Sequence, residues 1–458
     1  MIDVRRELDE APIGPYHVLL VALVGLIVFF EAYGTFNVAY VVHYVTGPWR
    51  LGPGQVGFLV SSGLIGFMAG SLLHGRFADR YGRRPVLLCG LWMAAGFSLA
   101  TALLGHSFQL FCGLRFCNGI GLGILLPLSV TYISEFSPAR MRSTFATWGW
   151  GLGFSAGGVG AAAAGVFLTP TLGWPSLYYV GSLAAVVAVA CHILLPESVQ
   201  FLALHGAAPD RIRLTLAKLH PARSAVYAQP GQVFTTARRQ PGAASVAALL
   251  SKRYRRTTLS VWGAAFFLLF AVYGLTGWVP TAMLQRGESV VASFSFGALI
   301  LAANFVGTLA SGYAADKTGC GRGSLAAWWV AGTLAVGTLA FVNLHLVNVI
   351  CVTAAGFFIL GGLGTLNNLT AGWYDTEVRG TGVGMMLGVG RIGGVLGPFI
   401  TGLLQQLVPG SAILFLAIAA ASFLGACMIL LASPATAMRA PAGLESMRIH
   451  GTTIGRIQ

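Results

Sequence analysis

Long apolar runs separated by short polar segments recur from one end of the chain to the other. Each run is about 20 residues or longer, which is the length that an α-helix needs to cross a bilayer. The first run is too long for the core of a signal peptide, and no cleavage site of small residues follows it, so we expect it to persist as a helix. We predict twelve membrane-spanning helices, at residues 18–45, 54–75, 85–104, 108–134, 141–168, 174–196, 257–283, 291–313, 324–345, 347–372, 378–408 and 411–433.

The polar stretch 197–254 divides these runs into six and six. It mixes Pro, Arg, Gln and Ala and contains no long apolar run, which is typical of a linker rather than a domain. We therefore predict an N-terminal tail (1–16), an N-terminal six-helix half (17–196), a linker (197–256), a C-terminal six-helix half (257–433) and a C-terminal tail (434–458).

The composition agrees with an all-α integral membrane protein. The chain has 458 residues, of which 56% are hydrophobic and only 9% charged, and its mean hydropathy is +0.76. A soluble domain carries about 25% charged residues. Too few polar side chains are present to cover a surface that faces water. The 62 glycines suit helices that pack closely within a membrane.

The net charge of +14 could suggest a nucleic-acid partner, but the basic residues are not distributed like those of a nucleic-acid binder. They gather in alternate loops, which is the positive-inside bias of membrane proteins. We therefore expect both tails and the linker in the cytoplasm, a multi-pass protein of the plasma (inner) membrane, and no nucleic-acid partner. The basic residues of these loops are Arg76, Arg80, Arg83, Arg84, Arg140, Arg142, ten from Arg211 to Arg256, Lys317, Arg322 and Arg379, whereas the other loops hold Arg50 and Arg286.

No pattern in the sequence predicts a metal or a cofactor. The seven cysteines have no metal-ligand spacing and suggest no disulfide framework, so we interpret them as small packing residues. The nine histidines are scattered.

The two halves repeat one another in sequence. "GRFADRYGRR" (75–84) aligns with "GYAADKTGCG" (312–321), which defines the repeat offset as the step in numbering from Gly75 to Gly312. The same offset carries Arg142 onto Arg379 and several glycines of the fifth helix onto glycines of the eleventh. Such a repeat implies two six-helix halves related by an axis along the membrane normal, as in transporters whose substrate site lies between the halves near the midplane.

The loop "GRFADRYGRRP" resembles the signature loop of the major facilitator superfamily. More narrowly, "RFCNGIGLGILLP" (115–127), "GWVPTAML" (277–284) and "RGTGVGMMLGVGRIGGVLGP" (379–398) resemble helices of the aromatic acid:proton symporter family. "LPESVQFLALHG" (195–206) resembles the end of that family's sixth helix. The resemblance implies a secondary transporter that works by alternating access and couples uptake of an organic, aromatic carboxylate to protons.

Three charged side chains lie well inside predicted spans: Glu31, Arg115 and Arg391. Each costs about 2.5–3.5 kcal/mol at mid-helix, so such residues normally face a cavity and act there, the alternative being a structural Glu–Arg pair. The repeat offset aligns Arg391 with Phe154, so the fold itself does not require an arginine at that position. The planar fork of an arginine can meet both oxygens of a carboxylate, and we predict that Arg391 binds the substrate.

Glu31 is the only carboxylate deep in any span, so we predict that it carries the coupled proton. Arg115 shares a helix face with Asn118, and the resemblance places this arginine at the cavity as well. The first helix of the family reads Asp–Gly–aromatic–Asp, whereas this chain reads Glu31–Ala32–Tyr33–Gly34, so the second acid is replaced by glycine.

Polar and aromatic residues of other spans are further candidates for the cavity wall. Aromatic residues near span ends are more often core or interfacial residues. Adjacent amides in an apolar helix rarely face lipid, which favours the pair Asn367–Asn368 as residues of the cavity wall. The candidates are Tyr33, Asn37, Trp148, Tyr273, Trp278, Asn304, Asn367, Asn368 and Trp373.

Charged residues of the basic loops are candidates for gating. In the superfamily the signature loop holds the two halves together on one side. The alternative interpretation is a charged loop that only fixes the topology of the chain in the membrane. The first copy contributes Gly75, Asp79, Arg80, Gly82, Arg83 and Arg84, and the degraded second copy contributes Asp316 and Lys317. The resemblance also implies gate pairs among Glu135, Arg142, Asp375, Glu377 and Arg379, although solvated loop charges are an equally good interpretation.

The sequence thus predicts a monomeric carrier of a small organic anion. An exporter of a drug or metabolite and an uncoupled facilitator of an organic anion or sugar-like solute stay open as alternatives. A transporter-like sensor is disfavoured because the linker and the tail 434–458 are short and lack apolar periodicity. No nucleophile–base set or phosphate-binding loop favours an enzyme.

Overall fold

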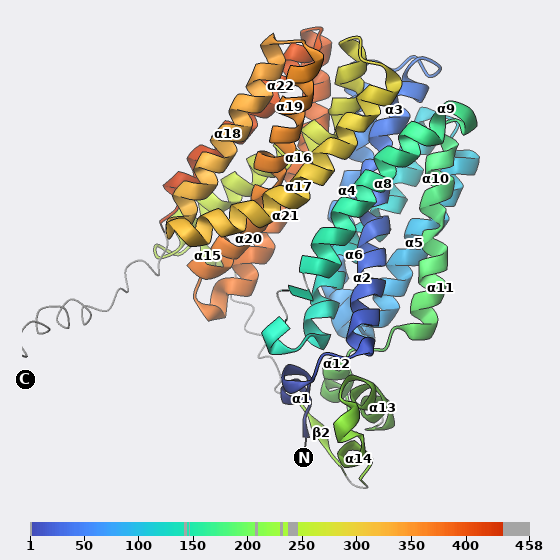
Figure 1. Cartoon of the computed structure of the whole chain (residues 1–458), viewed down its shortest axis with the longest axis vertical. Helices are drawn as coiled ribbons and strands as arrows, with labels where there is room; N and C mark the ends of the chain where they lie inside the picture. Colours follow the sequence, from blue (N-terminus) through green and yellow to red (C-terminus); the bar gives the residue numbers. More distant parts are fainter. Residues whose placement is uncertain are drawn as a thin grey trace, which may run out of the picture.

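The computed structural model describes residues 2–141, 144–145, 147–206, 209–229, 232–236 and 246–433, which are almost entirely helical. The N-terminal half (Figure 1) contains the following helices: α2 (Pro15–Phe36), α3 (Val38–Thr46), α4 (Pro53–Tyr81), α5 (Arg83–Leu104), α6 (Phe108–Phe136), a π-helix (Thr147–Leu152) that runs into α8 (Gly153–Phe167), α9 (Thr169–Leu172), α10 (Pro175–Ser182) and α11 (Ala184–Leu194).

The C-terminal half likewise consists of helices. Its elements are α16 (Arg255–Gln285), α17 (Val290–Thr318), α18 (Gly321–Phe341), α19 (His345–Ala355), a π-helix (Gly356–Leu360), α20 (Gly362–Trp373), α21 (Thr376–Leu407) and α22 (Ser411–Leu431). Within the described ranges, eleven helical segments are long and apolar enough to cross a membrane. The remaining predicted span is the shorter α8 with the π-helix before it, so twelve spans in two halves are confirmed.

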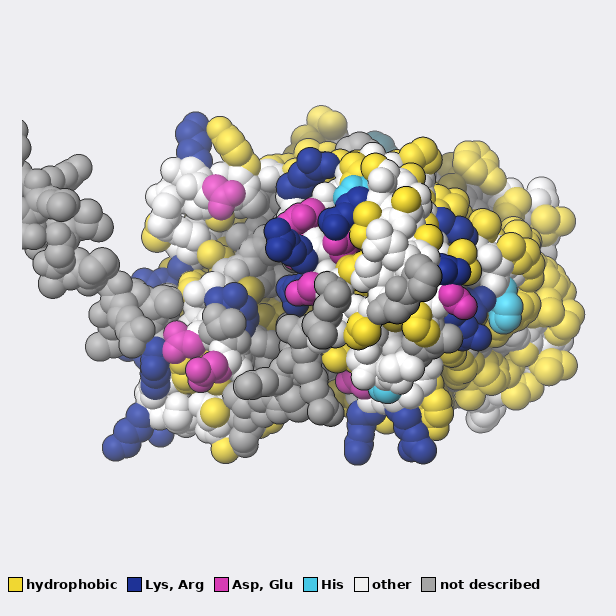
Figure 2. Space-filling view, turned by 90° about the horizontal axis from the view of Figure 1, so that it is seen from below, with side chains coloured by type: hydrophobic (Ala, Val, Ile, Leu, Met, Phe, Trp, Pro, Cys, Tyr) yellow, Lys and Arg dark blue, Asp and Glu magenta, His cyan; other side chains and the backbone are white. Residues whose placement is uncertain are grey.

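The polar ends of the molecule are unlike one another. One end carries the linker elements α12 (Val199–Leu204), α13 (Pro209–Leu219), α14 (Ser224–Tyr227), β2 (Phe234–Thr235) and α15 (Val246–Leu249), and we name it the linker face; the opposite end is the far face. Seen from below, the linker face carries many Lys and Arg side chains with a few acids between them (Figure 2).

The two halves touch near the far face and separate toward the linker face (Figure 1). The first turns of α4 cross the last turns of α21 so closely that a side chain at Gly57 would collide with the carbonyl oxygen of Pro398. One turn deeper, the Ser61 hydroxyl donates to the carbonyl oxygen of Val395 at 2.7 Å. These two contacts therefore join the halves on the side of the far face.

Backbone contacts within each half reproduce the sequence repeat. A side chain at Gly119 would collide with the carbonyl oxygen of Gly63, and one at Gly356 would collide with that of Ile300. The repeat offset carries both members of the first pair onto those of the second. The offset predicted from sequence is thus confirmed for these helices by their packing.

The fifth and eleventh helices depart from that offset by a single position. Gly157 of α8 abuts the carbonyl oxygen of Phe29, and Gly393 of α21 abuts that of Phe266. The repeat offset relates the two phenylalanines, but the two glycines are one position closer together in the numbering. The extra residue of the first half is accommodated by the π-helix Thr147–Leu152, whose wider turn absorbs one insertion.

This shift corrects one alignment made from sequence. The residue equivalent to Arg391 is Ser155 and not Phe154. A second contact agrees: a side chain at Gly158 would touch the ring of Phe36, as one at Gly394 would touch the ring of Tyr273. The first half still lacks an arginine at this place, so the asymmetry of the repeat remains.

The N-terminal segment folds onto the linker. Strand β1 (Ile2–Asp3) pairs in parallel with β2, and α1 (Val4–Glu10) follows it. Glu7 is 7% exposed; it accepts a hydrogen bond from the Tyr227 hydroxyl at 2.6 Å and pairs with Arg223 at 2.8 Å. The linker is thus structured through contacts with the tail that precedes the first span. The predicted boundaries stay predictions, and the tail 434–458 lies outside the described residues.

We expect Glu7→Gln to weaken the docking of residues 2–10 on the linker. The substitution removes the charge from a buried carboxylate that accepts one hydrogen bond and forms one ion pair. Amide hydrogen exchange of residues 2–10 should accelerate by about tenfold while the spans keep their protection. The matched control is Glu10→Gln on the same helix, whose ion pair with Arg6 is solvent-exposed. Equal exchange in the two variants would contradict a role for Glu7 in docking the segment.

Candidate functional site

A polar cluster lies where the halves meet, midway along their helices. Glu31 of α2 is 1% exposed, and its Oε1 accepts a hydrogen bond from Thr35 at 3.3 Å. Its Oε2 is buried and has no hydrogen-bond partner within the described ranges. A buried carboxyl group with one free oxygen is suited to carry a proton, because the neutral acid avoids the cost of a charge in a dry site.

Arg391 of α21 faces this carboxyl group from the other half. Its Nη1 donates to the Tyr273 hydroxyl at 2.6 Å, and its guanidinium carbon lies 4.2 Å from the ring centre of Phe67. Among the ion pairs of the described residues none joins Arg391 to Glu31, although the arginine is near enough for its charge to act on the carboxyl group. The Arg391 guanidinium is therefore held by the Tyr273 hydroxyl and the Phe67 ring. Its remaining N–H groups are available to an anion.

Two stacked rings lie beside Arg391 at the centre of the molecule. Phe36 of the first half and Tyr273 of the second are 6.4 Å apart between ring centres, with an interplanar angle of 23°. The repeat offset makes them equivalent residues, so their contact straddles the repeat axis. Phe36 also meets Phe154 edge to face at 5.4 Å. The polar pair Arg391–Tyr273 thus borders an aromatic surface.

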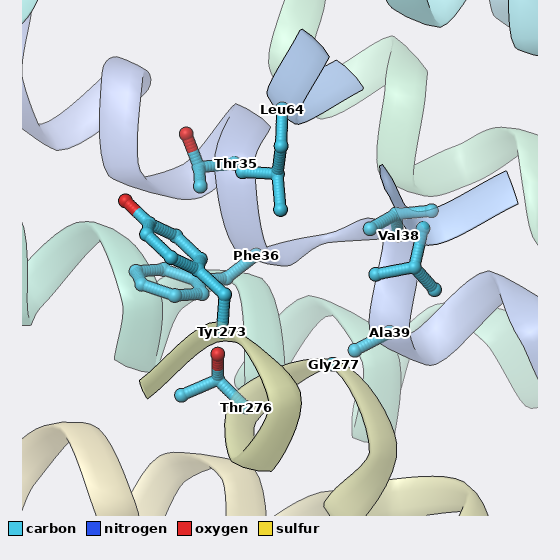
Figure 3. Close-up of a pocket in the computed structure, with 9 residues that line it drawn as sticks. Thr35, Phe36, Val38, Ala39, Leu64, Tyr273, Thr276 and Gly277 are labelled. Atoms are coloured by element: carbon cyan, nitrogen blue, oxygen red, sulfur yellow. The ribbon is translucent and has the colours of Figure 1, made fainter. Parts of the chain in front are cut away.

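The route beyond these rings toward the far face is closed. A cavity of about 10 Å³ lies there, close to the smallest space that holds one water molecule (Figure 3). No organic acid fits such a space. It is lined by Thr35, Phe36, Val38, Ala39, Val60, Leu64, Tyr273, Thr276 and Gly277.

Arg115 lies elsewhere, inside the N-terminal half. It is 2% exposed and donates through Nη1 to the carbonyl oxygen of Gly34 at 2.7 Å and to Asn37 Oδ1 at 3.3 Å. These partners flank the point where α2 ends at Phe36 and α3 begins at Val38. The structure therefore separates Arg115 from the Glu31–Arg391 cluster and places it at the junction of α2 and α3, where it bonds to the backbone and to Asn37.

The glycine that replaces the second family acid belongs to the same contact. A side chain at Gly34 would press on Leu122, and the carbonyl oxygen of Gly34 takes the hydrogen bond from Arg115. The neighbouring candidate Asn118 donates to the Ala94 carbonyl oxygen at 2.8 Å within the same half. Arg115 therefore donates to the backbone carbonyl of Gly34, the position at which the first helix of the family has its second acid.

Other predicted cavity residues are distributed over several places. The Tyr33 hydroxyl donates to the Leu177 carbonyl oxygen at 2.9 Å within the first half, and Trp278 donates to that of Pro398 at 3.0 Å within the second. Asn304 meets Ser155 across the two halves at 3.4 Å.

The paired amides Asn367 and Asn368 differ in exposure. Asn367 is half-buried with a buried Oδ1 that lacks a partner among the described residues, and Asn368 is exposed. Trp373 is buried at the end of the same helix, α20. The side chain of Trp148 lies outside the described residues.

The signature loop is held within its own half in this conformation. Arg83 pairs with Glu135 and with Asp79, each at 3.3 Å, and Arg80 lies over the ring of Tyr81. Gly82, at φ +102°, makes the tight reversal between α4 and α5. A hold between the two halves stays a prediction for a conformation closed at this face.

Glu197 was not assigned a role from the sequence, yet it organises this loop. Its carboxylate accepts hydrogen bonds from the backbone N–H groups of Arg83 at 2.9 Å, Arg84 at 3.3 Å and Ser198 at 2.8 Å. It thereby caps the start of α5, where free N–H groups attract an anion. Burial raises the pKa of this carboxyl, and the three amides oppose that shift. The only signal in the sequence was its position in the string "LPESVQ".

The remaining gate candidates lie near the linker face. Asp375 pairs with Arg253 at 2.6 Å and accepts a hydrogen bond from the Tyr254 hydroxyl at 2.5 Å, which joins it to the end of the linker and not to the first half. Arg142 lies outside the described residues. The other gate candidates show no contact between halves in the described ranges: Gly75, Arg84, Asp316, Lys317, Glu377 and Arg379.

Within the described ranges no group of three or more His, Cys, Asp or Glu side chains is close enough to hold an ion, and the seven cysteines are free. The described central site consists of one carboxyl group, one guanidinium and their hydroxyl and aromatic neighbours.

A family model described as Major Facilitator Superfamily matches residues 22–345. The chain belongs to this superfamily. It is therefore a multi-pass membrane transporter and not an enzyme, as predicted.

Several relatives extend over most of the chain. The 4-hydroxybenzoate transporter PcaK of Pseudomonas aeruginosa is 33% identical over 414 residues, covering 87% of this chain and 88% of its own. A gallate transporter of Pseudomonas putida is 32% identical, covering 94% of each chain. The benzoate transport protein of Acinetobacter baylyi is 28% identical and covers 94% of this chain and 92% of its own. The narrower resemblance to aromatic acid transporters is thus confirmed.

Solved structures of distant members share the fold. A D-xylose-proton symporter matches with a TM-score of 0.70 at 18% identity, over 92% of this chain and 98% of its own. An inward-facing bacterial homologue of the lysosomal transporter Spinster matches with a TM-score of 0.68 at 17% identity, over 93% and 96%. Together they confirm the fold of two six-helix halves.

We expect Arg115→Met to destabilise the protein, because it leaves the Gly34 carbonyl and the Asn37 side chain buried without their donor. The free energy of unfolding should fall by about 1–3 kcal/mol, measured by thermal unfolding in detergent. Arg115→Lys should recover part of the loss. Wild-type stability combined with a selective loss of substrate affinity would instead assign Arg115 to substrate binding.

Proposed function

We propose that the chain is a proton-coupled symporter that takes up an aromatic carboxylate by alternating access. The observation that carries this proposal is the central site, where a buried carboxyl group and a cation from opposite halves face one another beside aromatic rings. The relatives that transport 4-hydroxybenzoate, gallate and benzoate support the substrate class.

Arg391 binds the substrate carboxylate in this proposal. One of its donors is used by Tyr273, which fixes the plane of the guanidinium, and the cation lies against Phe67. A planar fork held in this way can donate two parallel hydrogen bonds to a carboxylate. The rings of Phe36 and Phe154 offer an apolar surface to the rest of an aromatic acid.

Glu31 carries the proton. It takes the proton from the side opposite the linker, the substrate then meets Arg391, and the neutralised site lets the halves close and reopen toward the linker face. One proton that moves with a monoanion transfers no net charge, so the pH gradient rather than the membrane potential drives uptake.

We also propose the orientation of the protein in its membrane. The basic residues of the linker face support a cytoplasmic position for the linker and both tails, in the plasma (inner) membrane. A single chain contains both halves of the site, which supports a functional monomer.

An uncoupled facilitator is the second candidate, and Gly34 favours it. The family pattern has two acids in the first helix, and here only Glu31 is available for coupling. Purified protein in proteoliposomes separates the candidates. Benzoate-like, aliphatic and sugar acids are offered with and without an imposed inward proton gradient.

We expect aromatic acids to accumulate above equilibrium only when the gradient is present. Equilibration without accumulation would establish the facilitator. Transport confined to aliphatic or sugar acids would refute the substrate class.

Glu31→Gln should abolish proton-driven accumulation, because the amide cannot take up a proton. Exchange of labelled for unlabelled substrate needs no net proton movement and should persist at least in part. Both rates are measured in the same proteoliposomes. Accumulation that still follows the pH gradient would exclude Glu31 as the coupling residue.

Arg391→Lys should weaken substrate binding although the positive charge is kept, because an ammonium group cannot donate two parallel hydrogen bonds. We expect KM for exchange to rise by about tenfold, which corresponds to about 1.4 kcal/mol. Arg286→Lys, near the far face, serves as the control. A wild-type KM in Arg391→Lys would refute two-pronged recognition.

A further inference from the structure

A second polar contact crosses between the halves at the centre of the molecule. Asn304 of α17 donates through Nδ2 to the hydroxyl oxygen of Ser155 on α8 at 3.4 Å, a long hydrogen bond. Asn304 is 9% exposed and Ser155 is 6% exposed. The mechanism described above leaves both residues unused.

The repeat relates this contact to the one made by Arg391. The repeat offset carries Phe67 onto Asn304, and the same offset reduced by one, which holds beyond the π-helix, carries Ser155 onto Arg391. Arg391 on Phe67 and Ser155 with Asn304 are therefore the same contact between halves, made once on each side of the repeat axis. The two contacts lie at the same depth, with the Phe36–Tyr273 stack between them.

The two sides differ in chemistry although they are equivalent in position. One side offers a cation that is held by a phenol, and the other offers a neutral amide and a hydroxyl. Thr308 donates to the Asn304 backbone carbonyl at 2.9 Å and lies 3.5 Å from its Oδ1. That contact turns the side-chain N–H groups of Asn304 toward Ser155, so the pair can both donate to and accept from a further group.

We propose that Asn304 and Ser155 form a second subsite, which recognises a hydroxyl group on the substrate ring at the end opposite the carboxylate. The proposal rests on the proposed function, since it requires the carboxylate to lie at Arg391. The aromatic ring then spans the stacked side chains Phe36 and Tyr273, and its hydroxyl inserts into the long hydrogen bond. A phenolic hydroxyl both donates and accepts, which matches a serine beside an amide.

The subsite predicts selectivity and not merely affinity. A site built to hydrogen-bond a hydroxyl group rejects an analogue without one, because its buried polar groups are then left poorly paired. A contact between Asn304 and Ser155 that only held the two halves together would give a different result. Loss of such a contact shifts the balance of conformations, and the apparent affinities for all substrates change by the same factor.

The experiment compares KM for exchange of benzoate, 4-hydroxybenzoate and 4-methoxybenzoate in proteoliposomes. The variants are Asn304→Leu and Ser155→Ala. Ser311→Ala is the matched control, because Ser311 is a buried residue of the same α17. Its described hydrogen bonds stay within its own half, with the Gly361 carbonyl and the Thr365 hydroxyl at 2.8 Å each and the Thr308 carbonyl at 3.2 Å.

We expect the wild type to prefer 4-hydroxybenzoate over benzoate, and each subsite variant to lose about tenfold of that preference. KM for benzoate should change by less than about twofold. The methoxy analogue accepts but cannot donate, so it should respond to Asn304→Leu more than to Ser155→Ala. The control should keep the wild-type preference.

An equal change of KM for all three acids, or an unchanged preference, would overturn the subsite. Failure of the proposed substrate class gives a different result, because wild-type protein would then exchange none of the three acids, whereas loss of proton coupling alone would leave exchange intact. Thermal unfolding of each variant in detergent separates loss of recognition from loss of folding.

Discussion

The fold depends on helices that touch through their backbones within each half. Glycines bring α4 against α6, α2 against α8 and α16 against α21, so close that a side chain would meet a carbonyl oxygen. Between the halves, glycine also brings α4 against α21 near the far face, and polar contacts lie at the same seam: a serine on a carbonyl, an amide on a serine, a cation on a ring. Alternating access requires this seam to separate while the packing within each half is kept.

The candidate functional residues lie at this seam. Charge inside a membrane is tolerated only where neighbours or a cavity compensate it. Glu31 and Arg391 come from opposite halves and face one another at the seam, whereas Arg115 is satisfied by the backbone of its own half. Two arginines with equal standing in the sequence therefore have different environments, one adaptable and one fixed.

The sequence was sufficient for the spans, the two halves, the repeat and the central pair Glu31–Arg391, because each rests on apolar length or on the cost of a buried charge. It could not place Arg115, since its partner is the carbonyl oxygen of Gly34 and backbone acceptors have no sequence signature. It also missed Glu197, whose role depends on a helix start far away along the chain, and the docking of residues 2–10 on the linker. Phe67 and Ser155 read as ordinary membrane residues until the opposite half supplied their partners.

The π-helix ahead of α8 carries a consequence for how the two halves diverged. An inserted residue would turn everything after it by about 100° around the helix axis, yet here one wide turn confines the change and the later glycines keep their neighbours. The part of the helix nearer the linker is thereby out of step with its counterpart in the other half. A single inserted residue at this place can therefore change the end of the fifth helix nearer the linker while the packing of α8 on α2 still matches that of α21 on α16.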